Sequence, residues 1–115
     1  MQLFTVSEIS YTAQKIQRSE FIAWLYPAQN VDQARELIAA HNKAHADATH
    51  NCYAYVIGFD RETQYYSDAG EPSGTAGKPM LNALLSASMT NVLAIVTRHF
   101  GGIKLGVRGL IEAYH

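Results

Sequence analysis

The residues that could bind an anion gather in two glycine-rich stretches of the sequence. The first, EPSGTAGKP, covers residues 71–79, and the second, FGGIKLGVRG, covers residues 100–109. Glycine lets backbone N–H groups approach a ligand closely, and a following helix turns the positive end of its dipole toward an anion. The alternative is that these glycines serve only tight turns and close packing of helices on a sheet.

The first stretch does not match the established phosphate-binding loops. Gly77-Lys78 is followed by Pro79 instead of Ser or Thr, and Pro72 stands where a Walker A loop has its first glycine. The dinucleotide-binding pattern G-x-G-x-x-G is absent from it as well. Residues 74–77 match the G-x-x-G of KH domains, but four residues are a weak signal. The spacing therefore permits an anion site without identifying its ligand.

Charges and hydrogen-bond donors accompany these glycines. We predict that an anion or a nucleic acid binds to Ser73, Gly74, Thr75, Gly77, Lys78, Arg98, Gly101, Gly102, Lys104 and Arg108. No acidic residue occurs from residue 72 to residue 111, an imbalance that can mark a surface for an anion or arise by chance in a short buried segment. Arg98 stands in an apolar run, so it could instead pair with Asp68 or Glu71.

Acid–base and metal chemistry have weaker candidates. Asp68 and Glu71 flank the first glycine-rich stretch and could act as acid and base, although such residues more often form turns and helix caps. His41 and His45 have the spacing of two metal ligands on a helix, but Asn42 replaces the glutamate of H-E-x-x-H. We therefore expect two exposed histidines on a helix, no metal and no cofactor.

Cys52 is the one cysteine of the chain, which excludes an internal disulfide. With His50 it would lie on one face of a strand, as a nucleophile and its base might be arranged in an enzyme. A small buried cysteine is the more common arrangement, and it is the one that we expect.

The composition is that of a single soluble domain. The chain has 115 residues, of which 48% are hydrophobic and 17% charged. No apolar run approaches the roughly 20 residues of a membrane span, and the N-terminus lacks the pattern of a signal peptide. We expect a cytoplasmic protein that does not bind a membrane.

The sequence pattern predicts alternating strands and helices around these stretches. Strands are expected over residues 3–9, 19–28, 50–59, 63–68 and 91–100, and helices over 31–45, 80–88 and from 106 onward. The run at 91–100 is almost continuously apolar, as in a strand that is buried on both faces. The order ββαββαβα predicts an α+β fold, a two-layer sandwich with the helices on one face of the sheet.

Three long blocks resemble the signature blocks of the YigZ/IMPACT family, in the same order and at similar spacing. They are DATHNCYAYVIG, SDAGEPSGTAGKPMLNAL and NVLAIVTRHFGGIKLGVRGLIEAY. The resemblance implies an IMPACT-type N-terminal domain over residues 1–115, with the α+β fold of ribosomal protein S5 domain 2. The ferredoxin-like second domain of bacterial members is expected to be absent from this chain. Arg108 departs from the family, which has small residues in that motif.

The resemblance implies a role in translation but no catalytic residues. Our first hypothesis is a translation-associated regulatory module that contacts RNA or another polyanion through the glycine-rich stretches and the basic residues of 72–111. The alternatives are an enzyme that acts on a small phosphorylated ligand, which we favour less, and a regulatory module that binds a protein. The expected partners are RNA or a phosphate-containing ligand and a protein of the translation machinery.

Overall fold

The computed structural model describes residues 2–114, without the side chains of residues 107 and 112. The elements along this part of the chain are β1 (Ser10–Ile16), β2 (Ser19–Pro27), α1 (Val31–Ala44), β3 (His50–Ile57), β4 (Thr63–Ser67), α2 (Gly77–Ser86), β5 (Val92–His99) and α3 (Gly106–Tyr114). The α+β class and the order ββαββαβα are confirmed.

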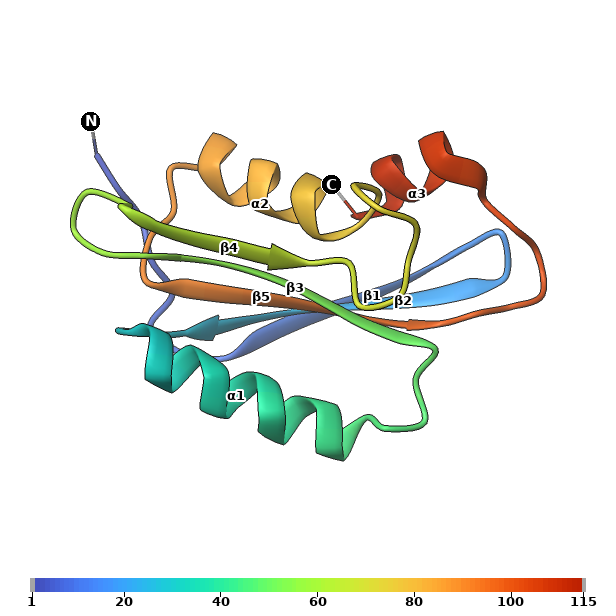
Figure 1. The fold of residues 1–115 in the computed structure, drawn as a ribbon, viewed down its shortest axis with the longest axis horizontal. Helices are drawn as coiled ribbons and strands as arrows, with labels where there is room; N and C mark the ends of the chain where they lie inside the picture. Colours follow the sequence, from blue (N-terminus) through green and yellow to red (C-terminus); the bar gives the residue numbers. More distant parts are fainter. Residues whose placement is uncertain (1, 115) are drawn as a thin grey trace.

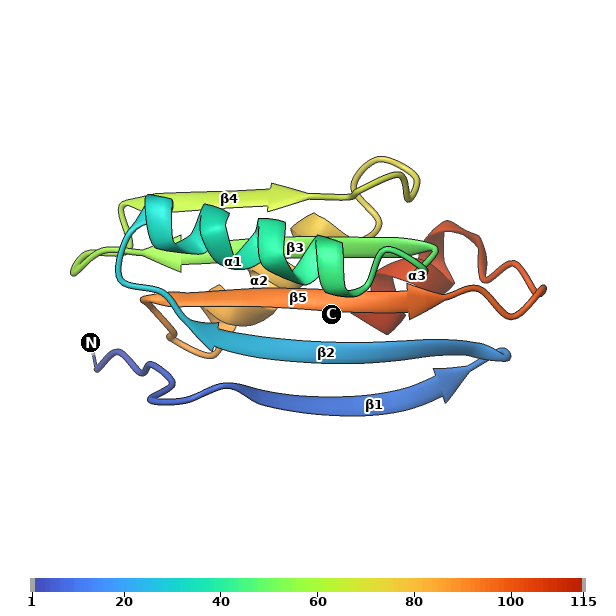
Figure 2. The same ribbon diagram turned by 90° about the horizontal axis from the view of Figure 1, so that it is seen from below.

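One antiparallel sheet carries the fold, and β5 is its central strand. The strand order is β1-β2-β5-β3-β4 (Figure 2). Ile95 of β5 lies between Trp24 of β2 and Tyr53 of β3. Every residue of β5 before His99 is buried, which confirms the expectation from its apolar run. Because both edges of β5 are paired and both faces are covered, this strand fixes where its C-terminal end places Arg98.

Helices cover both faces of the sheet, so the predicted placement of all helices on one face is wrong. Helix α1 lies on one face, and α2 and α3 lie on the other (Figure 1). Leu93 and Ile95 pack on the α1 side, whereas Val92, Ala94 and Val96 pack on the α2 and α3 side. A central strand that is apolar on both faces requires cover on both, and the sandwich therefore has three layers.

The first strand begins later than predicted. Residues 3–9 were expected to form it, but there Phe4 makes only an isolated bridge with Met89. Strand β1 is instead the first arm of a hairpin whose two turn residues, Gln17 and Arg18, have φ angles of 50° and 66°. Such left-handed turn residues match the twist of two paired strands. Six of the seven β1 residues are exposed, so the sequence contains no apolar signal for this edge strand.

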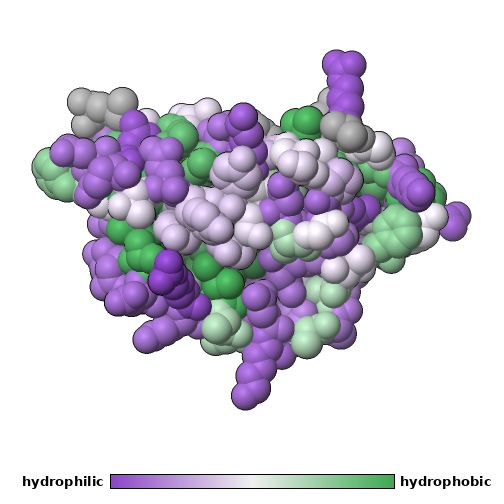
Figure 3. Space-filling model, viewed as in Figure 1, coloured by the Kyte–Doolittle hydropathy of each residue, from purple (hydrophilic) through white to green (hydrophobic). Residues whose placement is uncertain are grey.

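Hydrophilic side chains cover most of the face drawn in Figure 3, and hydrophobic side chains form separate patches there. Within residues 2–114, the helices are too short or too polar to cross a membrane.

His41 is buried between α1 and the sheet, which contradicts the expected exposed position. Its Nδ1 lies 2.7 Å from the Tyr26 hydroxyl, and its Nε2 lies 2.7 Å from Oγ1 of Thr97. The ring of His45 is 4.4 Å away. Burial, and then the nearby charge of His45, lowers the pKa of His41 to about 4. His41 therefore belongs to the core as a neutral ring with both nitrogens partnered.

This burial predicts a loss of stability in mild acid. Because the pKa of His41 is about 4 in the folded chain and 6.5 for a histidine in water, the unfolded chain binds more protons between these pH values. Stability should therefore fall as the pH drops from 6.5 to 4, by on the order of 3 kcal/mol. Urea unfolding of the wild type and of His41→Gln at a series of pH values measures this difference, and the variant should show the flatter profile.

The matched control is His99→Gln, which removes a less buried histidine. It should keep the pH profile of the wild type. Equal profiles for the wild type and His41→Gln would contradict the assignment of this acid sensitivity to His41.

Candidate anion-binding site

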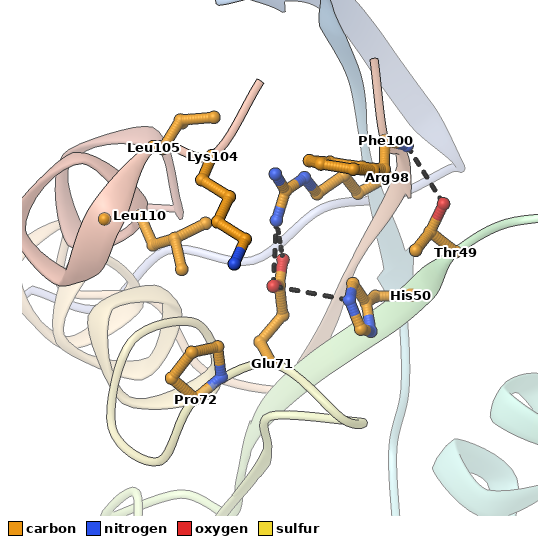
Figure 4. Close-up of a pocket in the computed structure, with 10 residues that line it drawn as sticks. Thr49, His50, Glu71, Pro72, Arg98, Phe100, Lys104, Leu105 and Leu110 are labelled. Carbon is orange, nitrogen blue, oxygen red and sulfur yellow. Dashed lines mark hydrogen bonds and ion pairs between the residues drawn. The ribbon is translucent and has the colours of Figure 1, made fainter. Parts of the chain in front are cut away.

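A cavity of about 410 Å³ opens at the end of the sheet where β3 begins and β5 ends (Figure 4). Its walls come from the start of β3, the loop after β4, the end of β5, and the loop that leads into α3. The residues that line it are Thr49, His50, Glu71, Pro72, Arg98, Phe100, Lys104, Leu105, Gly106 and Leu110. Both glycine-rich stretches contribute residues to this lining. The antiparallel register of β3 and β5 brings His50 opposite Arg98.

A buried ion pair forms the inner wall of the cavity. Nη1 of Arg98 donates hydrogen bonds to both carboxylate oxygens of Glu71, at 2.8 and 2.7 Å, and the side chains are only 5% and 3% exposed. The Tyr114 hydroxyl of α3 also donates to this carboxylate. Of the two partners considered for Arg98 in the sequence, Glu71 is the one that it contacts. The positive charge of Arg98 is therefore neutralised within the protein.

Arg98 is further held by aromatic rings and by a serine. Its guanidinium carbon lies 5.3 Å from the ring centre of Phe21 and 5.4 Å from that of Phe100, distances typical of cation–π contacts. Nε and Nη2 donate to Ser19 Oγ at 3.3 and 3.2 Å. These contacts fix the guanidinium in one position.

His50 completes the surroundings of Glu71. Its Nδ1–H donates to the Ala69 carbonyl at 2.9 Å, and its Nε2 lies 3.4 Å from Oε1 of Glu71. The Glu71 carboxylate thus has neighbours on three sides: Arg98, Tyr114 and His50. In this geometry it holds β5, the loop before α2, and α3 together, and its oxygens are engaged by these neighbours.

The first glycine-rich stretch wraps around a carboxylate of the protein itself. Oδ1 of Asp68 accepts hydrogen bonds from the N–H groups of Ala76 and Gly77, at 3.2 and 2.9 Å. Oδ2 accepts one from Gly74 at 2.9 Å. The chemistry inferred from the sequence, backbone donors at the start of a helix facing an anion, is therefore present, and Asp68 supplies the anion.

The remaining candidates of the first stretch are divided between interior and surface. Thr75 is buried, and its hydroxyl donates to the Pro72 carbonyl at 2.5 Å. Gly77 packs closely on β4, where a Cβ atom would lie 2.8 Å from the backbone of Ser67. Ser73 and Lys78 are exposed but do not line the cavity.

The second stretch leaves one cation open to the cavity. Lys104 is exposed and lines the cavity, and its amine points into the space in front of Glu71 (Figure 4). No described residue forms an ion pair or a hydrogen bond with this amine. Gly101 has a packing role, since a Cβ atom there would lie 2.0 Å from the Arg18 carbonyl oxygen. Gly102 and Arg108 are exposed and lie outside the cavity lining.

Cys52 is fully buried, as expected, and its thiol donates to the Asp68 carbonyl at 3.0 Å. Burial raises the pKa of this thiol to about 12, so it is not a thiolate nucleophile at neutral pH. Within residues 2–114, no group of three or more His, Cys, Asp or Glu side chains is placed to hold a metal ion.

The sequence analysis did not identify several residues of the site. Ser19 and Tyr114 lie 79 and 43 residues from their partners Arg98 and Glu71, and no local pattern links them. His50 was considered only beside Cys52, because both belong to one strand face. Its contact with Glu71 depends on the path of the loop after β4, for which the sequence offers no periodic signal.

The sequence model of the Impact N-terminal domain matches residues 17–115. The chain belongs to the IMPACT family. The IMPACT family member YvyE of Bacillus subtilis is 49% identical over 111 residues, which are 96% of this chain and 51% of the relative. The chain spans about half the length of the curated relatives that it matches. The family predicted from the three sequence blocks is confirmed.

Two solved structures share this fold. One, described as the crystal structure of a hypothetical protein, has a TM-score of 0.91 and 38% identity and covers 96% of this chain and 54% of its own. The other is the two-domain translational regulator Yih1, with a TM-score of 0.57 and 21% identity, covering 96% and 45%. At this identity, the likeness to Yih1 shows the fold alone.

The hydrogen bonds of Asp68 predict that Asp68→Ala destabilises the fold by about 2–3 kcal/mol, because three backbone N–H groups lose their acceptor. Asp68→Asn should lose less, since its amide oxygen can still accept. Urea unfolding measures both variants, and Asp47→Ala, which removes an exposed carboxylate, is the control. A loss no larger than that of the control would mean that water replaces the carboxylate.

The burial of Cys52 predicts a thiol that reacts only after local or global unfolding. Native protein should react with a thiol reagent at neutral pH far more slowly than protein unfolded in urea. Cys52→Ala should keep the fold and lose about 1 kcal/mol, a typical cost of a single substitution. Rapid labelling of the native protein would contradict this prediction.

Proposed function

We propose that this chain is a translation-associated binding module that contacts RNA at the cavity and at the exposed basic residues beside it. The observation that carries the proposal is the unpartnered amine of Lys104, which is exposed to a cavity whose two buried charges, Arg98 and Glu71, neutralise each other. An unpaired cation in a concave site favours an anionic ligand. The relation to translation follows from membership of the IMPACT family, for which the sequence resemblance implies a role in translation.

The exposed basic residues near the start of α2 and α3 extend this surface. Lys78 and Arg108 stand in the first turns of the two helices, which lie on the same face of the sheet (Figure 1). Ser73 adds an exposed hydroxyl in the loop before α2. With Lys104 they could contact about three phosphates, through charge and without reading bases. The backbone donors of the first glycine-rich stretch serve Asp68 in this proposal.

A protein partner is the second candidate, and a specific observation favours it. Three large hydrophobic side chains around the cavity and on α3 are partly exposed: Phe100 at 45%, Ile103 at 37% and Ile111 at 39%. Exposed apolar groups beside a cation suit an acidic protein surface with hydrophobic anchors. RNA binding would use the charge of this region more than its apolar area, and the two candidates therefore differ in their response to salt.

A salt titration tests the RNA proposal. Binding to single-stranded RNA should weaken with salt, with a slope of about −2 in log affinity against log salt for three contacts at ~0.7 each. Lys104→Ala should make the slope shallower by ~0.7 and weaken different sequences alike. Fluorescence anisotropy with labelled oligonucleotides at several salt concentrations provides both values.

The matched control is Lys43→Ala, which removes an exposed lysine from α1 on the opposite face of the sheet. It should leave the slope unchanged. Absence of RNA binding at low salt would contradict the proposal, and affinity for a translation-machinery protein with a weaker salt dependence than that expected for RNA would favour the second candidate.

A further inference from the structure

We propose that the cavity binds one nucleotide by its terminal phosphate, with Lys104 on the phosphate and Phe100 on the base. This inference rests on the proposed function and narrows it to a ligand class, a nucleoside that carries a phosphate monoester. The source is either a free mononucleotide or the phosphorylated end of an RNA strand. An internal segment of a strand is not the ligand of this cavity.

The charges of the cavity set the amount of negative charge that it accepts. The described lining side chains contain two permanent cations, Arg98 and Lys104, and one carboxylate, Glu71. Arg98 gives its Nη1 donors to Glu71 at 2.8 and 2.7 Å, so these two charges cancel. His50 also lines the cavity, but its Nε2 faces Glu71 at 3.4 Å, so only the Lys104 amine is left to neutralise a ligand, which suits one phosphate group and not a row of them.

The shape of the cavity favours the end of a strand over its middle. Its volume of about 410 Å³ lies within the range of pockets for single small molecules. The Glu71–Arg98 pair, almost completely buried, closes its inner side. A terminal nucleotide can therefore enter the cavity and stop at this wall.

The aromatic and apolar walls suit a nucleoside. The Phe100 ring packs on the guanidinium of Arg98 at 5.4 Å and is still 45% exposed, so part of its surface is open to a second flat group. Stacking on an aromatic ring accepts any base, because every base has a π-face. Pro72, Leu105 and Leu110 provide apolar surface around this position. Inorganic phosphate alone would leave these walls without a contact.

Calorimetric titration of the whole chain with adenosine 5′-monophosphate, adenosine and inorganic phosphate tests the ligand class. The mononucleotide should bind at least about tenfold more tightly than either of the others, because only it uses both the cation and the ring. Lys104→Ala should reduce its affinity to that of adenosine. Phe100→Ala should weaken the mononucleotide about tenfold and leave phosphate unchanged, which follows from the cost of losing one stacked base.

Two control variants remove similar side chains from elsewhere in the structure. Lys43→Ala changes an exposed lysine of α1, and Phe59→Ala changes a 90% exposed ring in the turn between β3 and β4. Both should bind the mononucleotide as the wild type does. The four substituted side chains are all exposed or half-exposed, so the fold should be kept, and a thermal melt of each variant checks this.

Oligonucleotides with and without a terminal phosphate separate this inference from the proposed function. Tighter binding of the phosphorylated strand, lost in Lys104→Ala, supports both and identifies RNA ends as the source. The inference is overturned if the two strands bind equally and if the mononucleotide binds no better than adenosine or neither binds. The RNA proposal is then still supported. Binding of the mononucleotide without binding of either strand supports the inference and contradicts the RNA proposal.

Discussion

The buried ion pair between Glu71 and Arg98 is the interaction on which this end of the molecule depends. It joins the last residues of β5 to the loop before α2, and through Tyr114 it also reaches α3. Moving two charges out of water is costly, and removing one partner of such a pair commonly costs about 3–5 kcal/mol. Here the cost is offset because nearly every polar atom of the pair has a partner, including Ser19 and two aromatic rings. The pair thus fixes the positions of these loops relative to the buried core.

The same pair determines which charge remains for a ligand. If Arg98 were open, the cavity would hold two free cations; with Glu71 bound to it, only Lys104 is left. The two glycine-rich stretches also differ in the groups that they leave available to a ligand. The first has three backbone donors occupied by Asp68, whereas the second carries the open lysine and the exposed Phe100 ring. Two stretches that are similar in sequence therefore have different roles in the structure.

The features that local patterns determine were predictable from the sequence. The apolar run of β5 and the ββαββαβα order follow from periodicity and turn residues, and the three signature blocks identified the family. Errors arose where no local apolar pattern marks the outcome. The exposed strand β1 is held by its hairpin with β2 and not by burial, and His41 is buried because Tyr26 and Thr97 supply partners for both ring nitrogens. Likewise, no pattern of spacing reveals that Asp68 fills the loop that follows it.

The pKa shifts of three buried groups show how the interior of this domain treats its titratable side chains. A catalytic acid or base works best with a pKa near the working pH, and enzymes shift pKa values toward that range. In this chain the shifts go the other way: the pKa of Cys52 is raised to about 12, that of Tyr114 is raised, and that of His41 is lowered to about 4. Burial is the largest cause of each shift, so these groups are held in their neutral forms. In the binding function proposed above, Lys104 and Phe100 of the cavity supply charge and aromatic surface.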